Sequence, residues 1–133
     1  MTVRQLRVVV RADDYDQAVA FYRDVLGLTE EEAYAGEGGA QVMILDAGRA
    51  TLEIANAAQV RMIDDVEVGR PVSPHIRIAF EVEDAVQVTQ RLADAGAHVI
   101  AAPTETPWRS LNARLEGPAD LQLTLFEELD PHA

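Results

Sequence analysis

The side chains most able to do chemistry in this 133-residue chain are two arginines, a glutamate and a histidine on predicted strands. Arg7 and Arg77 open the matching stretches "RVVV" and "RIAF", 70 positions apart, while Glu53 lies in "ATLEIAN". His75 stands at the start of "PHIRIAF". A histidine and a glutamate can ligate a metal ion, whereas arginine cannot but binds carboxylate and phosphate groups. These residue types therefore indicate two possible functions, the coordination of a metal ion and the binding of an anion.

Two copies of one strand–helix unit position these residues. "RVVVRADDYDQAVAFYRD" (7–24) aligns without gaps on "RIAFEVEDAVQVTQRLAD" (77–94). In each copy a strand leads into Asp-x-x-Gln, which is typical of a helix N-cap, and apolar residues at helical spacing follow. A glycine then marks the helix end. We therefore expect helices near 14–26 and 84–95.

Each predicted helix is followed by three shorter strand segments, with Gly, Asn or Pro at the turns between them. The segment 57–74 separates the copies and reads as a linker whose start is compatible with a helical turn. The chain is thus predicted to be a single domain (1–133) of two βαβββ units, the first over 1–56 and the second over 75–133.

This arrangement resembles the vicinal oxygen chelate superfamily, which includes glyoxalase I, extradiol dioxygenases, fosfomycin-resistance enzymes and bleomycin-binding proteins. The resemblance is carried by "DYDQAVAFYRDVLGL" (14–28), "AFEVEDAVQVTQRLADAGA" (79–97) and "TPWRSLNARLEGPADLQL" (106–123). It implies an α+β fold in which the two βαβββ units form a half-open barrel around a concave cleft, the glyoxalase/bleomycin-resistance/dioxygenase fold.

Strand alternation predicts which side chains line that cleft, because residues of one parity on each strand are apolar and should face the helices. The predicted ligand-binding residues of the cleft are Arg7, Val9, Met43, Glu53, His75, Arg77, Trp108, Thr124 and Phe126. Arg11 and Gln122 share the same parity. For Trp108 two interpretations stay open, a wall over the cleft or an aromatic side chain packed between strands.

In metal-dependent members of the superfamily, four strands each place one ligand in the cleft. The matching positions here are Arg7, Glu53, Arg77 and Thr124, and of these only Glu53 has suitable ligand chemistry. His75 shares the cleft-facing parity but lies two residues before the third position, about 7 Å further along the strand. We therefore predict no metal and no cofactor, with His75 as a strand-edge or rim residue.

Without a metal, Arg7, Glu53 and Arg77 could form a charge cluster. In one interpretation they close the cleft floor as a purely structural network, since buried arginines normally need a carboxylate partner. In the other, Glu53 neutralises one arginine and the second binds a carboxylate or phosphate group. Glu53 is expected to be a weak general base, because positive neighbours lower the pKa of a carboxyl group.

Composition limits the remaining functions. The chain has 11 basic and 23 acidic residues, and its net charge of −12 disfavours nucleic acid as a partner. That charge fits either solubility alone or a cationic ligand. The sequence contains no cysteine, no signal-like start and no apolar run of membrane length, so we expect a cytoplasmic protein without a membrane partner.

These observations favour a metal-independent protein that binds a small molecule in the cleft. Resemblance to the bleomycin-binding proteins implies that it sequesters a toxic or antibiotic compound. The alternatives are a lyase, isomerase or dioxygenase of the same superfamily with a non-standard or absent metal site, and a structural or regulatory dimer without a ligand. No catalytic residue can be named. Open strand edges and the concave face favour a homodimer.

Overall fold

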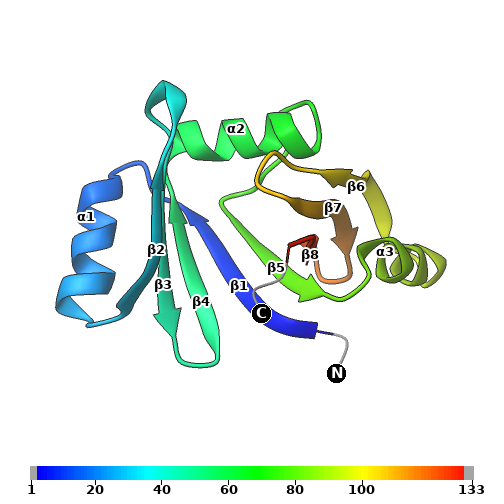
Figure 1. The fold of residues 1–133 in the computed structure, drawn as a ribbon, viewed down its shortest axis with the longest axis horizontal. Helices are drawn as coiled ribbons and strands as arrows, with labels where there is room; N and C mark the ends of the chain where they lie inside the picture. Colours follow the sequence, from blue (N-terminus) through cyan, green and yellow to red (C-terminus); the bar gives the residue numbers. More distant parts are fainter. Residues whose placement is uncertain (1–2, 131–133) are drawn as a thin grey trace.

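The computed structural model describes residues 3–130, in which eight strands form one mixed sheet with three α-helices against it (Figure 1). The strands are β1 (Val3–Arg11), β2 (Thr29–Ala35), β3 (Gln41–Ala47), β4 (Ala50–Ala55), β5 (Ile76–Val82), β6 (His98–Glu105), β7 (Ser110–Gly117) and β8 (Leu121–Glu128). The helices are α1 (Tyr15–Val19), α2 (Ala57–Glu67) and α3 (Ala85–Asp94), together with the π-helical segment η1 (Ala20–Val25) and the 3-10 turn η2 (Glu37–Gly39).

The sheet consists of two units that meet where β1 pairs with β5. Its strand order is β2-β3-β4-β1-β5-β8-β7-β6, so β2 and β6 are the edges and the curled sheet is not closed. β1 runs parallel to β4 and antiparallel to β5, and β5 runs parallel to β8. The predicted α+β fold, two βαβββ units in a half-open barrel, is confirmed.

Both helices of the repeat begin at the predicted caps. Oδ1 of Asp14 accepts a hydrogen bond from the backbone amide of Gln17 at 3.1 Å, and Oδ1 of Asp84 accepts one from Gln87 at 3.0 Å. Each bond satisfies one of the amide groups that the first turn of a helix leaves without a partner. The local sequence therefore determines where each helix starts.

The two helices differ in their second half. α3 stays α-helical, whereas η1 continues α1 with wider turns, in which the amide of Leu26 bonds to the carbonyl oxygen of Phe21. Counted from the capping aspartate, Gly27 comes one residue later than Gly96, and both glycines have a positive φ, of 91° and 107°. The π geometry accommodates that extra residue.

Each of these helices covers the convex side of its own unit. The buried core under α1 consists of Val19, Met43, Leu45 and Ile54. The core under α3 consists of Val82, Ala85, Val88, Ala113, Leu115 and Leu125. Because successive strand residues face opposite sides of a sheet, the residues between these core positions line the concave side.

The segment 57–74, read from the sequence as a linker, contains the 11-residue helix α2. Asn56 caps this helix, since its Oδ1 accepts a hydrogen bond from the amide of Gln59 at 2.9 Å. α2 lies across the concave side and contacts β3 and β4 of the first unit and β6 and β7 of the second (Figure 1). It therefore closes one end of the concave face. None of the described helices is long and apolar enough to cross a membrane.

Candidate functional site

Cross-strand pairing gathers the charged residues at the middle of the concave face. Val9 of β1 pairs with Glu53 of β4 on one side and with Arg77 of β5 on the other. Arg7 lies on the same face of β1, two residues before Val9. Thr124 of β8 completes the group, and we call the set formed by Arg7, Thr51, Glu53, Arg77, Thr124 and Phe126 the concave site.

Arg7 has three side-chain partners, Gln5, Glu53 and Phe126. Its Nη1 lies 3.7 Å from Oε1 of Glu53, and the two side chains are 20% and 17% exposed. Its Nε donates a hydrogen bond to Oε1 of Gln5 at 2.9 Å, and its guanidinium carbon lies 4.8 Å from the ring centroid of Phe126. An ion pair, a hydrogen bond and a cation–π contact thus fix this side chain.

Arg77 has far fewer partners although it is only 8% exposed. Its Nη1 donates a hydrogen bond to Oγ1 of Thr124 at 2.8 Å, and no carboxylate of the described residues lies within ion-pair distance of its guanidinium. Burial, followed by the nearby Arg114, lowers the pKa of Arg77, yet a guanidinium stays charged at ordinary pH. Arg77 is therefore a buried cation without a paired anion.

Glu53 differs from its expected protonation behaviour. Burial raises the pKa of the Glu53 carboxyl group, and the charges of Arg77 and then Arg7 lower it only in part. We expected a lowered pKa from the positive neighbours alone. The difference arises because desolvation of the carboxylate outweighs an ion pair that, at 3.7 Å, is longer than a hydrogen bond.

The residues of the concave site do not fit a metal ion. Arg77 uses the hydroxyl of Thr124 as an acceptor, and the guanidinium of Arg7 stands beside Glu53, so cationic groups fill the space that a metal ion would need. Within residues 3–130, no group of three or more His, Cys, Asp or Glu side chains is arranged to hold one. The only good ligand at the four compared positions is Glu53.

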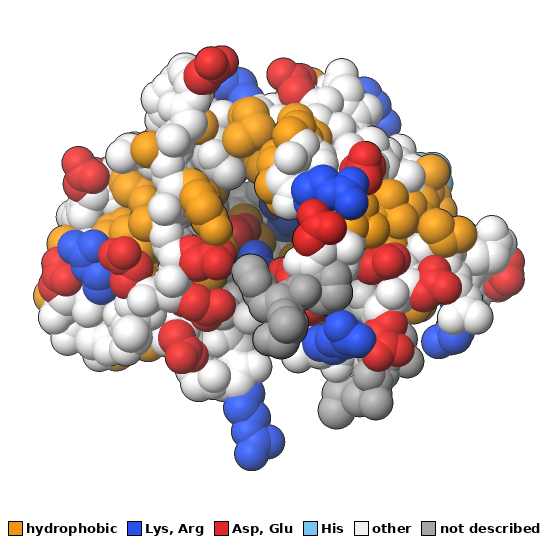
Figure 2. Space-filling view, in the orientation of Figure 1, with side chains coloured by type: hydrophobic (Ala, Val, Ile, Leu, Met, Phe, Trp, Pro, Cys, Tyr) orange, Lys and Arg blue, Asp and Glu red, His pale blue; other side chains and the backbone are white. Residues whose placement is uncertain are grey.

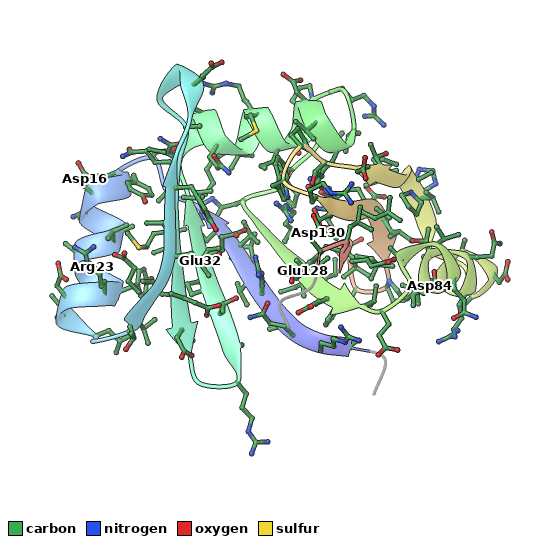
Figure 3. All side chains as sticks on the ribbon, in the orientation of Figure 1. Asp16, Arg23, Glu32, Asp84, Glu128 and Asp130 are labelled. Atoms are coloured by element: carbon green, nitrogen blue, oxygen red, sulfur yellow. The ribbon has the colours of Figure 1, made fainter. Side chains whose placement is uncertain are left out.

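Three carboxylates face the opening of the concave face, and we call Glu32, Glu81 and Glu128 the acidic mouth. Glu81 pairs in register with Gln5 and Phe126, so it lies on the same side of the sheet as Arg7. Figure 3 shows Glu32 of β2 and Glu128 of β8 on either side of β1. Figure 2 shows a hollow near the middle of this view, with basic side chains in its depth and acidic ones at its rim.

The other end of the concave face, under α2, contains an ion-pair network that the sequence analysis did not identify. Arg114 of β7 is fully buried, and it donates hydrogen bonds of 2.9 Å to Oδ1 of Asp64 and to Oε1 of Glu67. Its Nη1 also donates to Oγ of Ser73 at 3.0 Å and to Oε1 of Gln122 at 2.9 Å. We call these five residues the α2 network.

The α2 network fixes the charge state of its carboxylates. Burial raises the pKa of Asp64, but hydrogen bonds from the hydroxyl and amide of Ser73, then from Arg114 and Val72, bring this pKa below its ordinary value. Strand alternation could have identified Arg114, because it lies between the core residues Ala113 and Leu115 and must face the concave side.

Three predicted cleft residues lie away from the concave site. Met43 belongs to the core under α1, because Val42 and Ile44 are the residues of β3 that face α2. His75 is exposed just before β5, where its carbonyl oxygen accepts a hydrogen bond from the amide of Arg11 at 3.1 Å. Trp108 is 46% exposed in the turn between β6 and β7.

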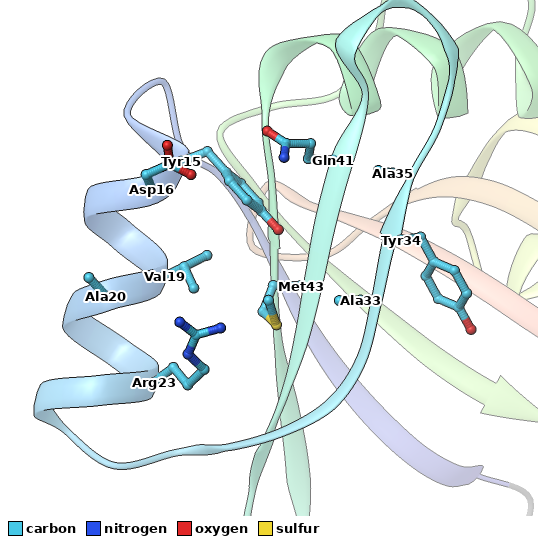
Figure 4. A pocket seen from close by; sticks show the side chains of 10 residues that line it. All are labelled: Tyr15, Asp16, Val19, Ala20, Arg23, Ala33, Tyr34, Ala35, Gln41 and Met43. Carbon is cyan, nitrogen blue, oxygen red and sulfur yellow. The ribbon is translucent and has the colours of Figure 1, made fainter.

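The described surface also has a hollow of about 420 Å³ on the convex side, between α1 and the strands β2 and β3 (Figure 4). Tyr15, Val19 and Met43 lie along it, whereas the ring of Tyr34 points away from α1. Its arginine, Arg23, is already paired with Asp24 and Glu30. This hollow therefore offers little free charge to orient a ligand.

A second hollow, of about 320 Å³, adjoins the acidic mouth, and Gln5, Thr51 and Glu81 are among its lining residues. Thr51 is only 3% exposed, and its Oγ1 has no hydrogen-bond partner in the described part of the chain. A buried hydroxyl without a protein partner is uncommon and leaves a hydrogen-bonding group free for water or for another molecule.

Comparison with known proteins places the chain in a group of related folds. A family model described as the Glyoxalase/Bleomycin resistance protein/Dioxygenase superfamily matches residues 4–125. A hypothetical protein from Bacillus halodurans has 14% identity and a TM-score of 0.70, with 96% of this chain and 95% of that chain covered. A glyoxalase/bleomycin resistance protein/dioxygenase superfamily member from Vibrio splendidus has 13% identity and a TM-score of 0.65, with 93% and 98% covered.

A variant of the Streptomyces coelicolor methylmalonyl-CoA epimerase, in complex with 2-nitronate-propionyl-CoA, has 21% identity and a TM-score of 0.67. The alignment covers 98% of this chain and 100% of that chain. At these identities the solved structures show a shared fold alone. No curated protein matches the chain.

Proposed function

We propose, for a chain that belongs to the Glyoxalase/Bleomycin resistance protein/Dioxygenase superfamily, that the concave site binds a small molecule through an anionic group and without a metal ion. The observation that carries this proposal is Arg77, a buried arginine that has one hydroxyl partner and no paired carboxylate. A buried charge is costly unless it is paired. A ligand carboxylate or phosphate would supply the missing partner, with two parallel hydrogen bonds to one guanidinium.

The contacts of Glu53 support the assignment of Arg77, and not Arg7, to the ligand. Glu53 pairs with Arg7 and not with Arg77, so the carboxylate of the site is already assigned to the other arginine. A closed structural network would require Glu53 to bridge both arginines, and its 3.7 Å contact involves only one. A protein that holds an anion in this way would sequester its ligand, such as a toxic or antibiotic compound, without altering it.

Proton transfer is a second candidate function, and the raised pKa of Glu53 favours it. A carboxylate whose pKa moves toward neutrality is a better general base than an ordinary one. An acid held by Arg77 would place its α-carbon close to Glu53. The reaction would be an isomerisation through removal and return of an α-proton, with Glu53 accepting and then donating the proton.

The test uses isothermal titration calorimetry with hexanoate and inorganic phosphate as probes, on the wild type, Arg77→Met and Arg61→Met. Arg61 is an exposed arginine of α2 and serves as the matched control. We expect the wild type and Arg61→Met to bind at least one probe alike, and Arg77→Met to bind it at least tenfold more weakly. Equal binding by Arg77→Met, or no binding of either probe by the wild type, would overturn the proposal.

A third probe, ethylmalonate, separates binding from proton transfer, because its α-proton lies between two carbonyl groups and is acidic enough to be removed. In D₂O, an isomerase would speed the exchange of this proton for deuterium, which NMR detects as a loss of the α-proton signal. A binder would leave the exchange at the rate seen without protein. Exchange that persists in Glu53→Gln would count against Glu53 as the base.

The proposal includes a homodimer. β2 and β6 are free sheet edges in the described chain, and Phe21, Val25 and Leu26 are 56%, 76% and 62% exposed on the helix of the first unit. Edges and exposed apolar side chains are commonly covered by a second copy. Light scattering should give twice the mass of the chain, and a monomer mass at 100 µM, about the top of the usual working range, would refute the dimer.

A further inference from the structure

The charges of the concave face are separated along the strands. Arg77 and Glu81 lie on the same face of β5, four residues apart, so their Cα atoms are about 13 Å from each other. The arginines occupy the floor, whereas the acidic mouth lies at the opening. A ligand that reaches Arg77 from outside therefore passes groups of the opposite sign.

Two carboxylates of the acidic mouth, those of Glu81 and Glu128, have no side-chain partner among the described residues. Glu81 and Glu128 are half-buried, and the side chain of neither forms a hydrogen bond or an ion pair with another described residue. The acidic residues next to them along the chain are satisfied, since Glu83 pairs with Arg4 and Glu127 accepts a hydrogen bond from the amide of residue 85 at 2.9 Å. Around β5 and β8, the carboxylates without a partner are thus the two that face the concave side, Glu81 and Glu128.

Glu81 and Glu128 are also close enough to repel each other. Burial, followed by the charge of Glu128, raises the pKa of Glu81, and the charges of Arg7 and Arg4 offset this only in part. Two like charges at a half-buried position are relieved most simply by a cation between them. Two carboxylates supply fewer than the three protein ligands that a metal site typically has, but they suffice to accept hydrogen bonds from an ammonium group.

Thr51 supplies an independent observation at the same place. Its buried Oγ1 lacks a hydrogen-bond partner, and it lines the hollow of about 320 Å³ together with Gln5 and Glu81. A hydroxyl oxygen and a carboxylate bordering one hollow can both accept hydrogen bonds from an ammonium group.

We infer that the ligand of the concave site is dipolar, with an anionic group at Arg77 and an ammonium or similar organic cation between Glu81 and Glu128. This inference rests on the proposed function, because it assumes an anion at Arg77. It reconciles two features of the chain that favour opposite ligands, the arginines of the site and the net charge of −12. Each end of the ligand meets the charge that attracts it.

The experiment compares 6-aminohexanoate with hexanoate and hexylamine, which match it in chain length. 4-Aminobutyrate and 8-aminooctanoate, each with its simple carboxylate, cover shorter and longer charge spacings. We expect at least one amino acid of the series to bind at least tenfold more tightly than its carboxylate, by calorimetry at low salt. High salt should reduce this preference, because the mouth is partly exposed to solvent.

Two variants locate the effect. Glu81→Gln combined with Glu128→Gln should abolish the preference for the amino acid without weakening hexanoate, because the carboxylate contact at Arg77 remains. Glu37→Gln removes an exposed carboxylate of η2, which lies outside the acidic mouth and the adjoining hollow, and should keep the preference. Circular dichroism melting verifies that the variants are folded, and an unfolded double variant is replaced by Glu81→Gln alone.

The outcomes separate this inference from the proposed function. If hexanoate binds through Arg77 but no amino acid of the series binds more tightly than its carboxylate, the dipolar ligand is refuted and anion binding stands. A preference that survives the loss of Glu81 and Glu128 also refutes it. If neither hexanoate nor phosphate binds to the wild type, the proposed function fails, and the dipolar ligand fails with it.

Discussion

Arg77 and Arg114 both point from the second unit into the concave face, but their surroundings are opposite. Arg114 is surrounded by Asp64, Glu67 and further acceptors under α2, so its charge is fully compensated. Arg77 donates only to a threonine hydroxyl. Because a buried guanidinium needs anionic partners in either place, the comparison indicates a structural role where the chain supplies the partners and a binding role where it does not.

The largest expected effect is on stability when Arg114 is removed. Arg114→Met leaves the carboxylates of Asp64 and Glu67 buried without their cation, so it should lower the free energy of unfolding by about 3–5 kcal/mol. Arg77→Met breaks no ion pair of the described chain and should change it by less than about 1 kcal/mol. Urea denaturation of both variants measures the difference, and equal losses would contradict the contrast between the two arginines.

A smaller effect is expected where α2 contacts the first unit. There the contact is apolar, because Val60 packs on the buried cluster of Val42, Ile44 and Ala55. Val60→Ala should lower the free energy of unfolding by about 1 kcal/mol, since Val60 is only partly buried. Thermal denaturation measures this change. A loss as large as that of Arg114→Met would mean that α2 depends on both units equally.

The smallest effect is a change in how stability depends on pH. The lowered pKa of Asp64 means that its contribution is present above about pH 4 and is lost as the pH falls through the folded-state value. The raised pKa of Glu53 means that the folded state favours the protonated carboxyl group. Stability is therefore lost as the pH rises from about 4.3 through the folded-state value.

Urea denaturation from pH 3 to pH 8 should thus show opposite changes in two variants. In Asp64→Asn, the free energy of unfolding should fall less than in the wild type when the pH is lowered below about 4. In Glu53→Gln, it should fall less than in the wild type when the pH is raised above about 4.3. Parallel pH profiles of the two variants would mean that desolvation does not dominate at Glu53.

The parts of the fold that follow from local signals were predictable from the sequence. The capping residues Asp14 and Asp84 and the alternation of β1 and β5 depend only on neighbours along the chain. Asn56 and Gln59 repeat the same capping pattern, so the start of α2 could have been predicted as well.

Other features depend on contacts that sequence spacing does not reveal. Arg114 and Glu67 are 47 residues apart, and nothing local links them. The face of Met43 was not predictable from alternation, because the run from Val42 to Leu45 is apolar and buried at every position. The pKa of Glu53 depends on how far the fold removes it from water, which is a property of the assembled sheet.

The π-helical segment η1 shows how two repeats can differ in length without losing their symmetry. Arg7 and Arg77 are 70 positions apart, whereas Gly27 and Gly96 are 69 apart, so the helical segment of the first unit is one residue longer than that of the second. The wide turns of η1 confine that difference to the outside of the barrel. One extra residue inside β1 would turn Arg7 away from the concave face, so a helix on the outside is where the fold tolerates a difference in length.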